Sequence, residues 1–338
     1  MTFLSFYYDQ KKNKLVKTST IEIALEKLNQ GEFVWLSFNN PTIDKFTTLI
    51  EPFKLHPMSI EDIFDENNVP KIDDYPKHCY IQCNAISYLD KQITVEPVNM
   101  FFNKNLLVTV IWDSSDKKQP LCDMQKVFES DLSIAKQGPA FAVHSILDHI
   151  IDKKLDAIEA IEDELMQIED DMLNNALDFD LSELQRIRND LLSLRRSFFH
   201  EREILVKICR MDTHYVPENA IIHYKDIYNH VNKFYDETEK CREMLSGIMQ
   251  TNFALVNIEM SKSANRTNAS VRRLTYVTTV FMPLSFFAGV GGMSEWSMMT
   301  GSENWMISYP VFLLAMVLIG IGSYFILKWL GRNDEKCI

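Results

Sequence analysis

The chain has 338 residues, a formal net charge of −12 and a mean hydropathy of −0.14. This acidity makes nucleic acid a poor partner and favours cations as ligands or cargo. The sequence holds no Gly-x-x-x-x-Gly-Lys loop, no nucleophile elbow and no paired metal-ligand motif, so we predict no ATP machinery and no enzyme. The closely spaced Cys79 and Cys83 have no matching second pair, and we interpret them as packing residues with reduced thiols.

Short apolar runs separated by turn signals predict a small α/β domain over residues 1–139. Helices are expected within 18–31, stopped by Gly31, and within 56–70, where Ser59 offers an N-cap with Asp62 three residues later. The expected strands cover residues 32–38, 78–89 and 96–112, the last broken by a turn at 103–105.

From about Ala140 the apolar residues recur with the helical period of 3.6 residues. This spacing predicts a helical hairpin over 140–218, packed on the α/β domain. Apolar residues recur every seven positions, and Lys154 interrupts them. Turns are expected at 174–180 and 211–220. No proline follows until Pro283, so a long stalk helix over 219–270 is expected to continue into the next segment.

Two runs without any charged residue, 274–290 and 309–327, predict two transmembrane helices over 271–293 and 309–329. Basic residues lie at the start of the first helix and at the end of the second. The loop 294–308 between the helices carries two glutamates and neither Lys nor Arg. By the positive-inside rule, both termini and the tail 330–338 are cytoplasmic and the loop is extracytoplasmic. The N-terminus has no basic segment before an apolar one, so we expect no secretory signal.

One face of the first predicted span carries small, polar or flexible side chains, which in a bilayer normally face protein or water. We predict that this stripe lines a pore; the alternative is close packing between helices. Two spans cannot enclose a pore alone, so the prediction requires a symmetric oligomer. The pore-lining candidates are Asn268, Val271, Thr275, Thr278, Met282, Ser285 and Gly289.

The segment TTVFMPLSFFAGVGGMS (278–294), followed by WMISYPVFLLAMV (305–317), resembles the CorA family of divalent-cation transporters. HPMSIEDIFDENNVPKIDDYPKHCYI (56–81), YKDIYNHVNKF (224–234) and REMLSGIMQ (242–250) are similar to upstream family segments, in the same order. The resemblance implies a homopentameric funnel with a cytosolic α/β domain, a long stalk helix and a pore lined by the first span. The second span would face lipid.

The resemblance breaks at the pore mouth, where the family carries Gly-Met-Asn after an aromatic residue. This chain has Gly292, Met293 and Ser294, with Gly291 at the aromatic position. A ring of serine hydroxyls can accept hydrogen bonds from a hydrated Mg²⁺ but reaches less far than asparagine. The neighbouring Glu295 offers a charged ring as another means of selecting cations.

The resemblance also implies a regulatory cation site between subunits. Asp226 matches a family aspartate of that site, and Asp90 is our candidate for its acidic partner. Without the cation the facing carboxylates would repel each other and loosen the pentamer. In family terms, the acidic run 156–171 would concentrate cations near the pore, but a solvated helix face is the simpler interpretation.

The sequence therefore predicts a membrane-potential-driven channel or transporter for divalent cations in the plasma (inner) membrane, gated by intracellular cation. Mg²⁺ is the expected transported and regulatory ion, and Co²⁺, Ni²⁺ or Zn²⁺ remain open. Its expected partners are further copies of itself, divalent cations and the lipid bilayer. The alternatives are a zinc transporter of the ZntB branch and a non-conducting cation sensor in the membrane.

Overall fold

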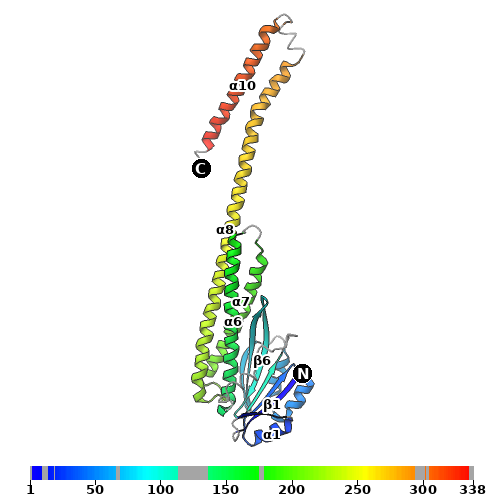
Figure 1. The fold of residues 1–338 in the computed structure, drawn as a ribbon, viewed down its shortest axis with the longest axis vertical. Helices are drawn as coiled ribbons and strands as arrows, with labels where there is room; N and C mark the ends of the chain where they lie inside the picture. The colour runs from blue at the N-terminus through cyan, green and yellow to red at the C-terminus, as the bar shows by residue number, and fades with distance from the viewer. Residues whose placement is uncertain are drawn as a thin grey trace. The chain divides into compact units, whose positions relative to one another are not determined.

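The computed structural model describes residues 2–9, 14–18, 20–65, 69–112, 136–174, 179–293, 301 and 304–334 (Figure 1). It divides into two compact units, Met1–Asn252 and Phe253–Ile338. The first unit holds a β-sheet with helices, and the second holds apolar helix.

The first unit is built on a seven-stranded mixed sheet in the order β2-β1-β3-β7-β6-β5-β4. Its strands are β1 (Thr2–Asp9), β2 (Lys14–Thr18), β3 (Val34–Asn39), β4 (Lys71–Tyr75), β5 (His78–Leu89), β6 (Gln92–Phe102) and β7 (Leu106–Ile111). The strands predicted within 32–38, 78–89 and 96–112 are confirmed. The turn that breaks the last is held by the Asn103 side chain, which accepts from the N–H groups of Asn105 and Leu106 at 3.0 and 2.9 Å.

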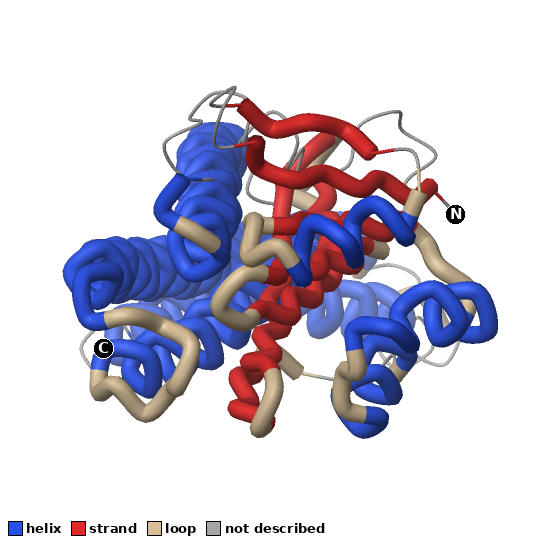
Figure 2. Tube along the Cα trace, turned by 90° about the horizontal axis from the view of Figure 1, so that it is seen from below, coloured by secondary structure: helices blue, strands red, loops and turns tan. Residues whose placement is uncertain are grey.

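Both faces of the sheet are covered, as the view in Figure 2 shows. One face packs on the short elements α1 (Ile21–Asn29), α2 (Ile43–Ile50), α3 (Pro57–Glu61) and the 3₁₀ turns η1 (Glu51–Phe53) and η2 (Asp62–Phe64). The other face packs on long helices. Alternation along β5 decides which side chain goes where: Cys79 and Cys83 are fully buried toward the long helices, and Tyr80 is buried toward the short ones.

The expected cap of α3 is wrong, because the helix begins earlier than predicted. Pro57 takes the first helical position, which its fixed φ favours. His56 is therefore the cap, and its Nδ1 accepts from the N–H of Met58 at 3.3 Å. Ser59 lies inside the helix, is fully buried, donates to the carbonyl of His56 at 2.7 Å and contacts Nε2 of His78 at 3.1 Å.

The buried His78 makes the stability of the first unit depend on pH. Burial, and then the nearby His56 ring, lower the pKa of His78 from 6.5 to about 4. The unfolded chain takes up a proton on this side chain below about pH 6.5, whereas the folded chain resists doing so until about pH 4. Stability from neutral His78 is therefore complete above pH 6.5 and is lost as the pH falls, by about 3 kcal/mol.

A His78→Gln variant tests this dependence. We expect it to be less stable than the parent at pH 7.5, and the gap in unfolding free energy to close as the pH falls toward 4.5. The measurement is the unfolding midpoint of the detergent-solubilised chain at each pH. A gap that does not vary with pH would contradict the prediction.

The three long helices are α6 (Pro139–Asn174), α7 (Leu181–Cys209) and α8 (Glu218–Gly291). Their breaks fall where the turns were predicted, and the heptad residues are buried. Lys154 is fully buried as well, because its ammonium pairs with Glu201 and donates to Ser197 Oγ at 2.9 Å. Lys154 can therefore occupy a buried heptad position because it forms an ion pair between α6 and α7.

The acidic run 156–171 lies on the exposed side of α6, except for Glu164. Glu164 is buried, accepts from the hydroxyl of Tyr88, and pairs with Arg186 of α7 and with Lys91. This network fixes the tip of the β5–β6 hairpin to α6 and α7, so a solvated face describes most of the run but not this position.

The second unit contains the last part of α8 and the helix α10 (Trp305–Asp334). Both helices are long and apolar enough to cross a membrane, and no part of either apolar stretch is buried within the chain. Apolar surface of this extent requires lipid or further subunits around it. The two predicted candidate spans are therefore present as helices.

Candidate ion pathway and cation site

The polar stripe of α8 is fully formed and exposed from Asn268 to Gly289. Two of its hydroxyls are bonded within the helix: Thr275 Oγ1 donates to the carbonyl of Val271 at 2.9 Å, and Thr278 Oγ1 to that of Leu274 at 3.1 Å. A hydroxyl bonded in this way keeps lone pairs that accept from water or from hydrated ions. These two threonines can therefore sit in an apolar helix with their donors bonded and still present oxygen atoms outward.

Contacts between α8 and α10 lie on the other side of α8. Leu284 packs close to Gly320 of α10, and Gly291 lies against the ring of Phe312. At 100° per residue these two positions are far around the helix from Thr278 and Ser285. No other described element covers the stripe, which is the arrangement a pore lining or a subunit interface needs.

Gly291 is packed so closely that a side chain there would require the Phe312 ring to move. A Cβ built at this residue would lie 2.7 and 2.8 Å from atoms of the Phe312 ring, closer than real Cβ contacts. The position where the resemblance leads us to expect an aromatic residue is thus covered by an aromatic ring from α10.

The helix α8 ends at Gly291 and a turn follows. The N–H of Gly292 donates to the carbonyl of Ala288 at 3.0 Å, and the N–H of Met293 to that of Val290 at 3.2 Å. Gly292 and Met293 are exposed at this end of the stripe. Ser294 and Glu295, the other two residues of the predicted mouth, lie outside the described residues.

Pro283 inside α8 adds a group that the sequence analysis did not single out. Proline has no N–H, so the carbonyl four residues earlier, at Thr279, loses its helical donor. An open carbonyl beside the hydroxyl stripe is a further oxygen for water or a hydrated cation. The proline itself is the sequence signal for it.

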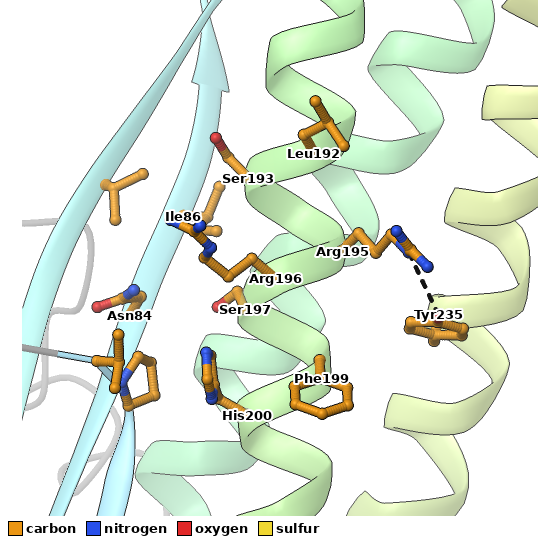
Figure 3. A pocket seen from close by; sticks show the side chains of 13 residues that line it. Asn84, Ile86, Leu192, Ser193, Arg195, Arg196, Ser197, Phe199, His200 and Tyr235 are labelled. Atoms are coloured by element: carbon orange, nitrogen blue, oxygen red, sulfur yellow. Dashed lines mark hydrogen bonds between the residues drawn. The ribbon is translucent and has the colours of Figure 1, made fainter.

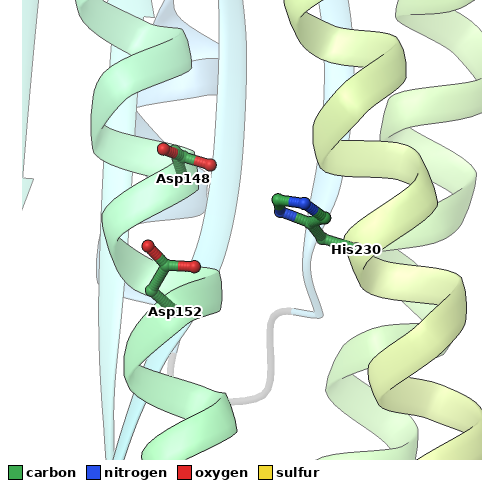
Figure 4. Close-up of side chains that lie close together, drawn as sticks. All are labelled: Asp148, Asp152 and His230. Atoms are coloured by element: carbon green, nitrogen blue, oxygen red, sulfur yellow. The ribbon is translucent and has the colours of Figure 1, made fainter.

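A second constellation lies in the first unit, between α6 and α8. Asp148, Asp152 and His230 each offer a ligand atom, and these atoms all lie within 4.8 Å of one another (Figure 4). The two aspartates are four residues apart and so share one face of α6, opposite the imidazole of α8. Two carboxylates and an imidazole form a plausible donor set for a divalent cation.

The electrostatics of this cluster favour a bound cation. Burial, and then the neighbouring carboxylate of Asp148, raise the pKa of Asp152. Nδ1 of His230 is buried and has no hydrogen-bond partner among the described residues. A cation between these groups would neutralise the facing carboxylates and give the imidazole nitrogen a partner.

Asp226 lies near this cluster, and Asp90 does not. Asp226 is exposed on α8, one turn before His230, and its charge acts on His144, whose pKa burial lowers. Asp90 occupies the tight β5–β6 turn with a φ of 53°. The amine of its neighbour Lys91 lies 3.2 Å from Glu164, which is about 24 Å along α6 from Asp148 by helical rise. Within one chain the structure does not bring the two predicted ligands together.

Sequence reasoning missed Asp148, Asp152 and His230. The available signal was the i, i+4 pair of aspartates within LDHIID, together with the clustering of His144, His149, His223 and His230 on two helices. Because those helices are far apart in sequence, the pairing itself becomes visible only in the folded chain.

Comparison with known proteins assigns the family. The CorA-like Mg2+ transporter protein family matches residues 30–329. The chain is 27% identical to the putative metal ion transporter YfjQ of Bacillus subtilis over 310 residues, covering 90% of this chain and 93% of that one. It is 25% identical to the cobalt/magnesium transport protein CorA of Thermotoga maritima, covering 90% and 85%.

Solved structures agree on the fold. The CorA magnesium transporter of Methanocaldococcus jannaschii matches with a TM-score of 0.65 at 19% identity, covering 98% of both chains. Full-length CmaX matches with 0.68 at 17% identity, covering 98% of this chain and 97% of that one. The cytoplasmic domain of ZntB from Vibrio parahaemolyticus matches 76% of this chain and 99% of its own length, with 0.56 at 11% identity. The chain has an α/β domain, a long helix and two C-terminal apolar helices, and it belongs to the CorA-like family of membrane transporters for divalent metal cations.

Proposed function

We propose that this protein is a homopentameric channel that lets divalent cations, Mg²⁺ in particular, enter the cytoplasm down the membrane potential. The observation that carries the proposal is the oxygen-bearing stripe of α8, exposed on the side away from α10. Five such stripes around an axis would line a pore, with Gly292, Met293, Ser294 and Glu295 at its mouth. Entry of a doubly charged ion at 100 mV, inside negative, gains about 4.6 kcal/mol.

In this proposal the protein lies in the plasma (inner) membrane with both termini in the cytoplasm. The charge distribution supports this orientation, because Arg272 and Arg273 lie at the start of the first span and Lys328 near the end of the second, whereas the loop between them has no basic residue. The first unit, with its cluster of Asp148, Asp152 and His230, would then be exposed to the cytoplasmic cation concentration.

Uptake into proteoliposomes under an imposed inside-negative potential tests the proposal. Mg²⁺, Co²⁺, Ni²⁺ and Zn²⁺ are supplied in turn, with cobalt hexaammine as a mimic of hydrated Mg²⁺. We expect Mg²⁺ uptake that the mimic blocks. Uptake of Zn²⁺ alone would favour the zinc-transporting alternative, for which the ZntB match shows only a shared fold. No uptake of any ion by an intact oligomer would favour the non-conducting sensor.

The stripe itself is tested by Thr278→Val, which removes a hydroxyl and keeps the shape. We expect Mg²⁺ uptake to fall by about tenfold, the equivalent of one lost hydrogen bond to a hydrated ion at about 1.4 kcal/mol. Ser323→Ala is the matched control, since that hydroxyl also donates to a carbonyl of its own helix, Ile319 at 2.8 Å, but lies on α10 and not on the stripe of α8. Equal effects of the two variants would show that the lost hydrogen bond within the helix, and not a lost contact with the ion, explains the fall in uptake.

We also propose that cation binding at Asp148, Asp152 and His230 regulates the pore. The three side chains bridge α6 to α8, and α8 is the helix that continues into the predicted span. Asp226 would add a carboxylate, and Asp90 is a ligand that only a neighbouring subunit could supply. Mg²⁺ would use the carboxylates and its own waters, whereas Co²⁺, Ni²⁺ or Zn²⁺ would also take the imidazole.

Limited proteolysis of the solubilised chain tests this regulatory site. We expect Mg²⁺ and Co²⁺ to protect the parent from trypsin. Asp152→Asn should raise the concentration needed of both ions by about tenfold, which corresponds to about 1.4 kcal/mol. His230→Gln should raise it for Co²⁺ but not for Mg²⁺. Asp163→Asn, at an exposed aspartate elsewhere on α6, is the control. Unchanged protection in Asp152→Asn would remove the cluster from the mechanism.

A further inference from the structure

A cavity of about 810 Å³ opens in the first unit between the β5–β6 hairpin and α7, with Tyr235 of α8 at one side (Figure 3). It lies within residues 69–235 and shares no lining residue with the cation cluster or the polar stripe. Its volume falls in the range of about 300–1,000 Å³ typical of small-molecule sites.

The polar lining of this cavity is basic, in a chain with 47 acidic and 35 basic residues. Ser193, Arg196 and His200 are three and four residues apart, so they share one face of α7. Figure 3 shows their side chains directed toward the strand that carries Asn84. No Asp or Glu belongs to the described lining.

Arg196 is the group most available to a ligand. The adjacent Arg195 is occupied, since its Nε lies 2.7 Å from Glu239 and 3.3 Å from the Tyr235 hydroxyl. Arg196 has no carboxylate within salt-bridge distance in the described part of the chain, although its guanidinium points into the cavity. A guanidinium presents paired N–H donors that match phosphate oxygens.

The floor is polar but adds no net charge, because the buried Lys154 beneath it is paired with Glu201. Ser197 lines the cavity and is almost fully buried, and its hydroxyl accepts from the ammonium of Lys154 at 2.9 Å. The remaining walls are apolar and include Ile86, Val95 and Leu192. The cavity therefore combines an anion-binding end with a surface for an organic group, which a single inorganic ion would not fill.

We propose that this cavity binds a phosphorylated small molecule of nucleotide size, with its phosphates on Arg196 and His200 and its organic part on the apolar wall. The site is independent of the proposed transport function, and it would bind an anion, whereas the pore would pass cations. Because the lining spans the sheet, α7 and Tyr235 of α8, an occupant would tie these three elements together.

Thermal unfolding and equilibrium binding of the solubilised full chain test the proposal. ATP, pyrophosphate and adenosine are compared in EDTA, so that no divalent cation reaches the cation cluster. We expect ATP to raise Tm, pyrophosphate to bind more weakly and adenosine to have no effect. Arg196→Ala should weaken ATP binding at least tenfold, and Arg196→Lys by less. Arg188→Ala, at an exposed arginine of the same helix outside the cavity, should leave binding unchanged.

Absence of any Tm change with both ATP and pyrophosphate would overturn the proposal, as would an equal loss in Arg188→Ala, which would indicate non-specific charge attraction. A Ser193→Cys variant supplies a second measurement, made against the parent with its native cysteines. Its thiol should react with a polar thiol reagent in the assembled protein, and ATP should slow the reaction. A thiol that does not react would show that a neighbouring subunit fills the cavity, and would also overturn the proposal.

Discussion

Replacing Gly291 with tyrosine should abolish divalent-cation uptake, and replacing Phe312 with alanine in the same chain should restore part of it. The reason is geometric: a Cβ at Gly291 would already lie 2.7 Å from the Phe312 ring. A tyrosine ring cannot share that volume, so α8 and α10 would separate at the end where the predicted mouth begins. Overpacking of this kind costs about 1–3 kcal/mol and displaces backbone.

Uptake in proteoliposomes measures the effect, with oligomer integrity checked by size-exclusion chromatography. Gly291→Ala should reduce uptake modestly, because the contacted atoms are the far end of a side chain that can turn. Gly322→Ala on α10 is the matched control, since nothing lies within 4 Å of a Cβ built there. Full uptake by Gly291→Tyr, or no recovery in the double variant, would show that this contact does not set the position of the mouth.

This contact also shows where sequence reasoning ended. In the sequence, a glycine stands where the resemblance leads us to expect an aromatic residue. The structure adds that a ring is present near that place but comes from α10. No periodicity or motif connects Gly291 with Phe312, because they lie on different helices and only folding brings them together.

Elements with a strong repeating pattern were predictable. The heptads of α6 and α7, the breaks after Asn174 and Cys209, and the alternation along β5 all follow from where apolar side chains must be buried. The hairpin β1–β2 and the strand β4 were not predicted. β4 reads KIDDY, and only its Ile72 is buried, so a sheet edge of this kind leaves little apolar signal.

The candidate sites also differed in how far the sequence could predict them. The stripe of α8 belongs to a single helix, so its spacing could be read directly from the chain. The cluster of Asp148, Asp152 and His230 needs two helices in a particular register. Register between helices is set by packing at the buried positions, and the polar residues follow it without leaving a repeat of their own.

The buried pair of Lys154 and Glu201 should have the largest effect on stability. Both side chains are almost completely buried, at 0% and 2% exposure, and they pair across α6 and α7. Among the described residues, Lys154→Met would leave the buried Glu201 carboxylate with Ser197 as its one hydrogen-bond partner, at 3.3 Å. Loss of one member of a buried pair costs about 3–5 kcal/mol. Burial already raises the pKa of Glu201, so the orphaned group would relieve part of that cost by taking up a proton.

The double variant Lys154→Met/Glu201→Leu separates the pair from its parts. Buried ion pairs are often replaced by apolar residues of similar size at little cost, so we expect the double variant to be more stable than Lys154→Met alone. Urea and thermal midpoints of the solubilised chain provide the measurement. Lys153→Met is the control, because the neighbouring lysine is exposed and pairs with Asp156 on the helix surface. Strictly additive losses would mean that water reaches the two charges, and that the heptad face of α6 tolerates Lys154 through hydration and not through its partner.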